Sequence, residues 1–209
     1  MNILFSPPSL DDFIRLLKAW RFWVLGALIG SAIGAALFYV VPPPYRAKAT
    51  VNVDFNFEEA FPTNTDRQDF YYLEREARKM EEIAWSDDVL SKLDAPADEL
   101  REGILTLSQP AEAGWHFYAD DSNPQKAEEL ASTWANAFVE KVQAEIQAGN
   151  LNKFIKLEVT QSADLPKERS IPLSNYLLSG AIGFLLISVF AVLFIQRKDS
   201  NVLSSPRGT

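Results

Sequence analysis

The sequence contains no cysteine and a single histidine, and both shortages limit the chemistry it can support. Without cysteine there is no disulfide framework, no zinc-thiolate site and no thiol nucleophile. A lone histidine, His116, supplies neither a catalytic triad nor a histidine-based metal site. Glycine-rich phosphate or dinucleotide loops are also absent, and neighbouring carboxylates such as Asp87 and Asp88 are explained as solvated surface. We therefore predict that the protein is not an enzyme and has no catalytic, cofactor or metal site.

Charged residues are missing from two long stretches, 22–41 and 176–195. About 20 apolar residues in a helix span the roughly 30 Å hydrocarbon core of a bilayer. The sequence therefore predicts two transmembrane helices over these ranges. A cleaved signal peptide is the alternative for the first stretch, but its apolar run is longer than the roughly 7–15 residues typical of such peptides. We favour an uncleaved anchor.

The charges that are present are distributed unevenly. Residues 1–21 carry three basic and two acidic residues, 42–175 carry 14 and 25, and 196–209 carry three and one, which gives net charges of +1, −11 and +2. Positive charge beside a membrane span marks its cytoplasmic side. We predict a two-span plasma (inner) membrane protein with both termini in the cytoplasm and the central domain periplasmic or extracellular. The acidic domain also argues against nucleic acid as a partner.

Glycine is scarce, but it recurs at regular spacing in the predicted membrane helices. Gly26, Gly30 and Gly34 follow one another every four residues in the first, and Gly180 and Gly183 lie in the second. A face of small side chains lets another helix approach closely. We predict that these glycines pack the two helices together, within one chain or between chains of a homo-oligomer.

Proline flanks the central domain on both sides. One proline segment follows the first span, and a second, residues 163–175, precedes the other span. Proline fixes φ and lacks an N–H, so we expect both segments to be stiff and extended. We also expect Arg169→Pro to be tolerated in such a segment. The residues predicted to couple the domain to the membrane are Pro43, Pro44, Tyr45, Pro166, Arg169 and Pro172.

The central region, 42–175, has the patterns of a single α+β domain. Period-two alternation predicts strands over 45–57, 104–109, 115–119 and 155–160. We expect the first and last strands to pair in a mostly antiparallel sheet packed against helices.

Two helices are predicted within this domain. Residues 70–93 form the first, with a break at Ser86, and 124–147 form the second, which starts at Asn123-Pro124. The polar stretches 58–69 and 94–102 read as connections. The face of the first helix expected to be buried contains Leu73, Ala77, Met80, Ile83 and Ala84. Outside the domain, residues 9–20 predict an amphipathic helix in the cytoplasmic lead 1–21, and 196–209 form a short cytoplasmic tail.

Several motifs occur in a characteristic order relative to the two spans. They are PPYRAxAxVxV from Pro43, Ser-x-x-Val-Leu from Ser86, Asp-x-x-Pro from Asp121, Asn-Ala-Phe from Asn136 and AxxPxxxxxP from Ala163. In this order the chain resembles the Wzz-type chain-length determinant, or polysaccharide co-polymerase, family, as a short two-span member without a kinase domain. It departs from the family at Arg169, where a proline is usual, and in lacking a long helical extension.

This resemblance implies a non-enzymatic membrane scaffold. Such proteins form homo-oligomeric rings that regulate the chain length or export of a surface polysaccharide, such as O-antigen, capsule or exopolysaccharide. The implied partners are the lipid bilayer, a polysaccharide polymerase or a separate cytoplasmic tyrosine kinase, and the polysaccharide itself. The alternative is an accessory or sensor subunit of another membrane complex with no role in polysaccharide synthesis.

Overall fold

A computed structural model describes residues 14, 17–56, 59, 66–109 and 114–203. The chain divides into two compact units, one made of 1–42 with 171–209 and the other of 43–170. The first unit contains two apolar helices and the second an α+β arrangement. Residues 9–13, 15 and 16 of the predicted amphipathic helix and residues 204–209 of the predicted tail fall outside the described residues, whereas 196–203 continue the second apolar helix.

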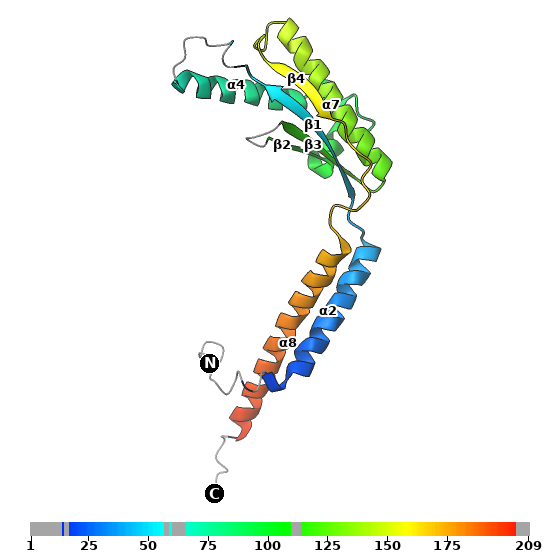
Figure 1. The fold of residues 1–209 in the computed structure, drawn as a ribbon. Helices are drawn as coiled ribbons and strands as arrows, with labels where there is room; N and C mark the ends of the chain where they lie inside the picture. Colours follow the sequence, from blue (N-terminus) through cyan, green and yellow to red (C-terminus); the bar gives the residue numbers. More distant parts are fainter. Residues whose placement is uncertain (1–13, 15–16, 57–58, 60–65, 110–113, 204–209) are drawn as a thin grey trace. The chain divides into compact units, whose positions relative to one another are not determined.

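The two apolar helices are α2 (Trp20–Val40) and α8 (Leu173–Leu203), and they lie side by side and antiparallel (Figure 1). Trp20–Val40 and Leu173–Val192 are long and apolar enough to cross a membrane, by length and composition. The second helix begins at Leu173, before the predicted start at residue 176. It does so because Pro172 directly precedes the first turn, where its missing N–H costs no hydrogen bond.

The α+β unit contains one antiparallel sheet in the order β2-β3-β1-β4. Its strands are β1 (Tyr45–Asp54), β2 (Leu105–Ser108), β3 (Trp115–Asp121) and β4 (Lys156–Gln161). The predicted pairing of the first with the last strand is confirmed, and β2 pairs with β3. The first strand is shorter than predicted, because Asn56 has a φ of 49° and its N–H bonds the Asp54 carboxylate at 2.9 Å, which turns the chain out of the sheet.

The helices of this unit are α4 (Asp66–Ala84), α5 (Asp87–Leu90), α6 (Ala97–Glu99), η2 (Leu100–Ile104) and α7 (Pro124–Gln147). α7 has the predicted bounds, because the Asn123 side chain accepts hydrogen bonds from the first free N–H groups and Gly149, at a φ of 82°, follows its end. The predicted connection at 94–102 was wrong in part. It contains α6 and the start of η2, where the buried Leu100 anchors the segment to the core.

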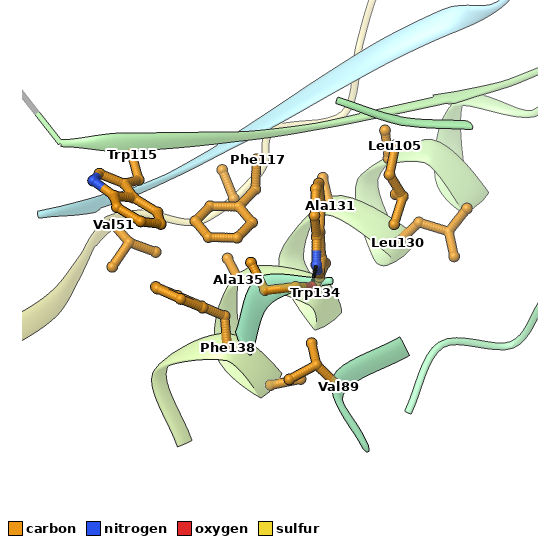
Figure 2. Packing of buried hydrophobic residues seen from close by; sticks show 14 of the residues in the cluster. Val51, Val89, Leu105, Trp115, Phe117, Leu130, Ala131, Trp134, Ala135 and Phe138 are labelled. Atoms are coloured by element: carbon orange, nitrogen blue, oxygen red, sulfur yellow. Dashed lines mark hydrogen bonds between the residues drawn. The ribbon is translucent and has the colours of Figure 1, made fainter. Parts of the chain in front are cut away.

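The core lies between α7 and the face of the sheet that it covers (Figure 2). Trp134 of α7 is fully buried at its centre, with its ring 4.9 Å from the ring of Phe117 and 4.8 Å from that of Trp85. The indole Nε1–H donates a hydrogen bond of 2.8 Å to the carbonyl oxygen of Ala84. Ala84 is the last residue of α4, where carbonyl groups have no partner within the helix. Trp134 thus joins α7, the sheet and the end of α4.

The buried face of α4 differs from the prediction. Leu73 is 36% exposed, whereas Glu76, at the spacing of four that leads to Met80 and Ala84, is buried. The prediction assigned only apolar residues to the buried face and therefore excluded Glu76. The burial of Glu76 depends on ionic and hydrogen-bond partners that the periodicity of α4 alone does not reveal.

Candidate functional site: a glycine seam and an arginine clamp

The two apolar helices touch along a glycine seam, formed by Gly26, Gly30 and Gly34 of α2 and Gly180 of α8. The three glycines of α2 are buried. A methyl group at Gly30 would overlap the carbonyl oxygen of Gly180, and one at Gly180 would overlap that of Gly30. The two backbones are therefore in direct contact at this point, and any larger residue would force them apart.

The seam continues on both sides of this contact. A methyl group at Gly34 would overlap the carbonyl oxygen of Tyr176, whereas one at Gly26 would overlap the side chain of Ser188 and lie 3.1 Å from the carbonyl oxygen of Phe184. The Ser31 hydroxyl donates a hydrogen bond of 3.4 Å to the Leu177 carbonyl. Packing of small residues and hydrogen bonds between helices are the two forces that associate helices in lipid.

Gly183, which was predicted to pack the helices, lies outside the seam. No atom lies within 4 Å of a methyl group placed there. It follows Gly180 by three residues, or about 300° of helical rotation, so the two glycines do not face the same neighbour.

The seam also forms within one chain, so the glycine face of α2 is already covered and is not free to bind a second copy.

An arginine clamp joins the first and last segments of the α+β unit, and it consists of Pro43, Tyr45 and Arg169. The Nη1 of Arg169 donates a hydrogen bond of 2.6 Å to the Pro43 carbonyl, and the guanidinium lies 4.7 Å from the centroid of the Tyr45 ring. Beside it, the Ser170 N–H donates to the Pro44 carbonyl at 2.9 Å, and Tyr45 and Arg169 form an isolated antiparallel bridge. The two segments are thus held next to each other.

These contacts give Arg169 a function that the proline spacing did not predict. A charged donor makes a stronger hydrogen bond than a neutral one, and a planar guanidinium stacks on an aromatic ring. Proline at position 169 would supply neither contact, so the structure reverses the expectation that Arg169→Pro is tolerated. Of the other predicted coupling residues, Pro166 is half-buried and Pro172 lies in the other unit, directly before α8.

Glu76 is a buried charge that sequence reasoning missed. Its Oε1 accepts hydrogen bonds from Arg75 Nε at 3.0 Å and Lys79 Nζ at 3.2 Å, and its Oε2 accepts one from the Asn152 N–H at 3.4 Å. A carboxylate is buried at acceptable cost only when it is paired in this way. Glu76 therefore joins α4 to the segment that precedes β4. Its spacing of four residues from both Tyr72 and Met80 was the one sequence signal for its burial.

Several other ionisable groups form pairs at the surface. Asp87 pairs with Arg101 at 2.5 Å and Asp88 with Lys141 at 2.8 Å. The hydrogen bond from Lys141 lowers the pKa of Asp88, which keeps this exposed carboxylate ionised and does not suit a general acid. Among the described residues, no group of three His, Asp or Glu side chains lies close enough together to hold a metal ion.

No protein-family model matches this chain, and no curated protein does. The resemblance to the chain-length determinants therefore depends on the order and spacing of the sequence motifs.

Proposed function

We propose that this chain is a two-span membrane scaffold, without enzymatic activity, that regulates the chain length or export of a surface polysaccharide. It acts in the plasma (inner) membrane with both termini in the cytoplasm and the α+β unit on the outer side. Its partners are further copies of itself, the bilayer, and either a polysaccharide polymerase or a separate cytoplasmic tyrosine kinase.

Membrane insertion is supported by the glycine seam. The apolar side chains of α2 and α8 that point away from the seam are exposed, among them Leu28, Ile29, Leu186 and Ile187. Exposed apolar side chains around a tightly packed helix pair suit a lipid environment, whereas water would disfavour them. The packing of α2 against α8 also favours an anchor that remains part of the mature protein over a signal peptide that is removed.

The observation that carries the proposal is the arginine clamp. The chain enters the α+β unit at Pro43 and leaves it at Ser170, and the clamp ties these two ends to each other. β1 and β4, which lie nearest these ends in the sequence, are also neighbours in the sheet. A scaffold that controls a growing chain by its geometry needs such a fixed relation between its connecting segments.

The proposed orientation predicts which positions are open to a reagent that does not cross the membrane. The chain lacks cysteine, so single cysteines at Ser6, Glu129 and Ser204 are specific targets. Glu129 is exposed on α7. In intact cells, or in spheroplasts if an outer membrane is present, only the cysteine at position 129 should react with an impermeant maleimide, and the other two should react after lysis. Labelling at position 6 or 204 before lysis would overturn this orientation.

The proposed function predicts a change in polysaccharide length. Deleting the gene in its host should alter the length distribution of a surface polysaccharide on a gel, and the wild-type chain should restore it. Arg169→Ala should restore it only in part at equal protein level, because the two ends of the α+β unit are no longer tied. Lys167→Ala, an exposed neighbour without an ion pair among the described residues, is the matched control and should restore it fully.

Two results would count against the proposal. An unchanged length distribution after deletion would favour an accessory or sensor subunit of another membrane complex. Full restoration by Arg169→Ala, in a host where deletion has a clear effect, would mean that the protein is still a scaffold but does not need the arginine clamp for length control.

A further inference from the structure

The sheet face opposite α7 carries polar and aromatic side chains in an ordered array. Lys48 of β1, Tyr118 of β3 and Thr106 of β2 lie directly opposite one another across three neighbouring strands. The next row has the same composition of one ring between two polar groups. It contains Thr50, His116 and Ser108. We call these six residues the polar grid; its strands lie about 4.8 Å apart.

An aromatic ring with a fixed cation over one of its faces occupies the centre of the polar grid. Tyr118 is half-buried, and the Arg46 guanidinium lies 5.8 Å from the centroid of its ring. Arg46 is held by Asp120, whose two carboxylate oxygens accept from Nε at 2.7 Å and Nη2 at 2.6 Å. A guanidinium has five N–H donors, so this pairing leaves three of them for another acceptor. Arg46 is thus positioned in advance to donate hydrogen bonds.

The polar grid also contains a cation without a partner. Lys48 is exposed, and among the described residues it forms no ion pair and no hydrogen bond. His116 adds no charge at neutral pH, because burial and then the charge of Lys48 lower its pKa, and its Nδ1 lies 3.2 Å from the Thr50 hydroxyl. With Arg46 balanced by Asp120, Lys48 gives the polar grid a local positive charge within a domain of net charge −11, whereas the acidic Asp54 and Glu158 lie farther along the same face.

We infer that the polar grid binds an acidic oligosaccharide, with one sugar ring against the side of Tyr118 that Arg46 does not cover and its carboxylate on Lys48. A sugar ring has a face of C–H groups that packs on an aromatic ring, and hydroxyls around its edge that exchange hydrogen bonds with Thr106, Ser108 and Arg46. The inference rests on the proposed function, because it names the part of a polysaccharide that the scaffold would contact.

The composition of this face favours a sugar over a protein partner. Protein interfaces bury a central cluster of aromatic or aliphatic side chains. The exposed large hydrophobic residues of the described α+β unit are Tyr71, Leu73 and Leu165, and none of them is on these strands. A face of hydroxyls and charges around one ring lacks such a cluster.

The test is a binding titration of the full chain in detergent with octagalacturonate, followed by calorimetry or by NMR. Neutral maltooctaose and an octaglutamate peptide are the comparison ligands. We expect octagalacturonate to bind most tightly, because it alone combines pyranose rings with carboxylates. We also expect its binding to weaken with salt, since Lys48 is exposed.

Variants assign the binding to the polar grid. Tyr118→Ala should weaken it by roughly tenfold, because the ring contact is lost, whereas Tyr118→Phe should stay within about twofold. Lys48→Ala should weaken it by roughly fivefold. Lys156→Ala is the control, because Lys156 is an exposed cation on the same face, opposite Asp54 at the far end of β1, and its Nζ already pairs with the Glu59 carboxylate at 3.7 Å. It should bind as the wild type does, and urea midpoints should verify that each variant is folded.

Each remaining outcome has a definite meaning. No binding of octagalacturonate, or equal weakening by Lys156→Ala and Lys48→Ala, overturns the saccharide site. Octaglutamate binding as tightly as octagalacturonate also overturns it and indicates an acidic protein partner instead. If octagalacturonate does not bind but gene deletion changes the polysaccharide length, the proposed function stands and the saccharide site is wrong. If octagalacturonate binds but gene deletion leaves the polysaccharide length unchanged, the saccharide site stands and the proposed function is wrong.

Discussion

Gly30→Leu should separate α2 from α8, whereas Gly183→Leu should leave the two helices packed. At Gly30 an added side chain would overlap the backbone carbonyl of Gly180, and a backbone cannot move aside by changing rotamer. Overpacking of well-packed sites costs about 1–3 kcal/mol, and we expect the upper end here. At Gly183 no atom lies within 4 Å of the added methyl group, so a side chain has room.

The distance between the helices measures this effect directly. Spin labels on cysteines at Leu28 and Leu186 would lie on exposed positions of α2 and α8, and no native cysteine competes for the label. Wild type and Gly183→Leu should give the same narrow distance distribution, and Gly30→Leu a broader and longer one. Dilution with unlabelled chains should not change the wild-type distances, because the seam forms within one chain. A narrow distribution for Gly30→Leu would contradict the seam.

Trp134→Ala should be among the most destabilising substitutions in the α+β unit. Trp134 is fully buried and contacts the rings of Phe117 and Trp85, so truncation leaves a large cavity. Replacing a core tryptophan by alanine costs about 3–5 kcal/mol, a large part of the roughly 5–15 kcal/mol that stabilises a typical domain. The end of α4 also loses the hydrogen bond to the Ala84 carbonyl.

Trp134→Phe separates the two contributions. It retains a ring between Phe117 and Trp85 but removes the donor to Ala84, so it should cost about 1–3 kcal/mol. The measurement is urea unfolding of the full chain in detergent, followed by near-ultraviolet circular dichroism. Equal losses for Trp134→Phe and Trp134→Ala would mean that the hydrogen bond, and not ring packing, dominates this site.

The elements that the sequence predicted well have local causes. α7 has its predicted bounds because Asn123, Pro124 and Gly149 act on their own backbone neighbours. The first strand is visible in the alternation from Tyr45, which reflects one buried and one exposed face. Such signals lie within a few residues, so they need no knowledge of the rest of the fold.

The features that were missed depend on partners far away in the chain. Arg169 bonds the carbonyl of a residue 126 positions earlier, and Glu76 bonds the N–H of Asn152, 76 positions later. Leu73 is apolar and yet exposed, because burial of that helix face is decided by the elements packed on it. In the two apolar helices the four-residue glycine repeat identified the seam, but it did not identify which of the glycines in α8 would face it.

The antiparallel pairing of β1 with β4 also determines how the α+β unit responds to mechanical force. Its two chain ends lie side by side, so a pull that separates them acts across the hydrogen bonds and opens them one after another. A pull along the strands in opposite directions would instead load many bonds at once. The first bonds to break are those from Arg169 and Ser170 to the proline carbonyls. Tension on the chain ends is therefore relieved at the arginine clamp before it reaches the core around Trp134.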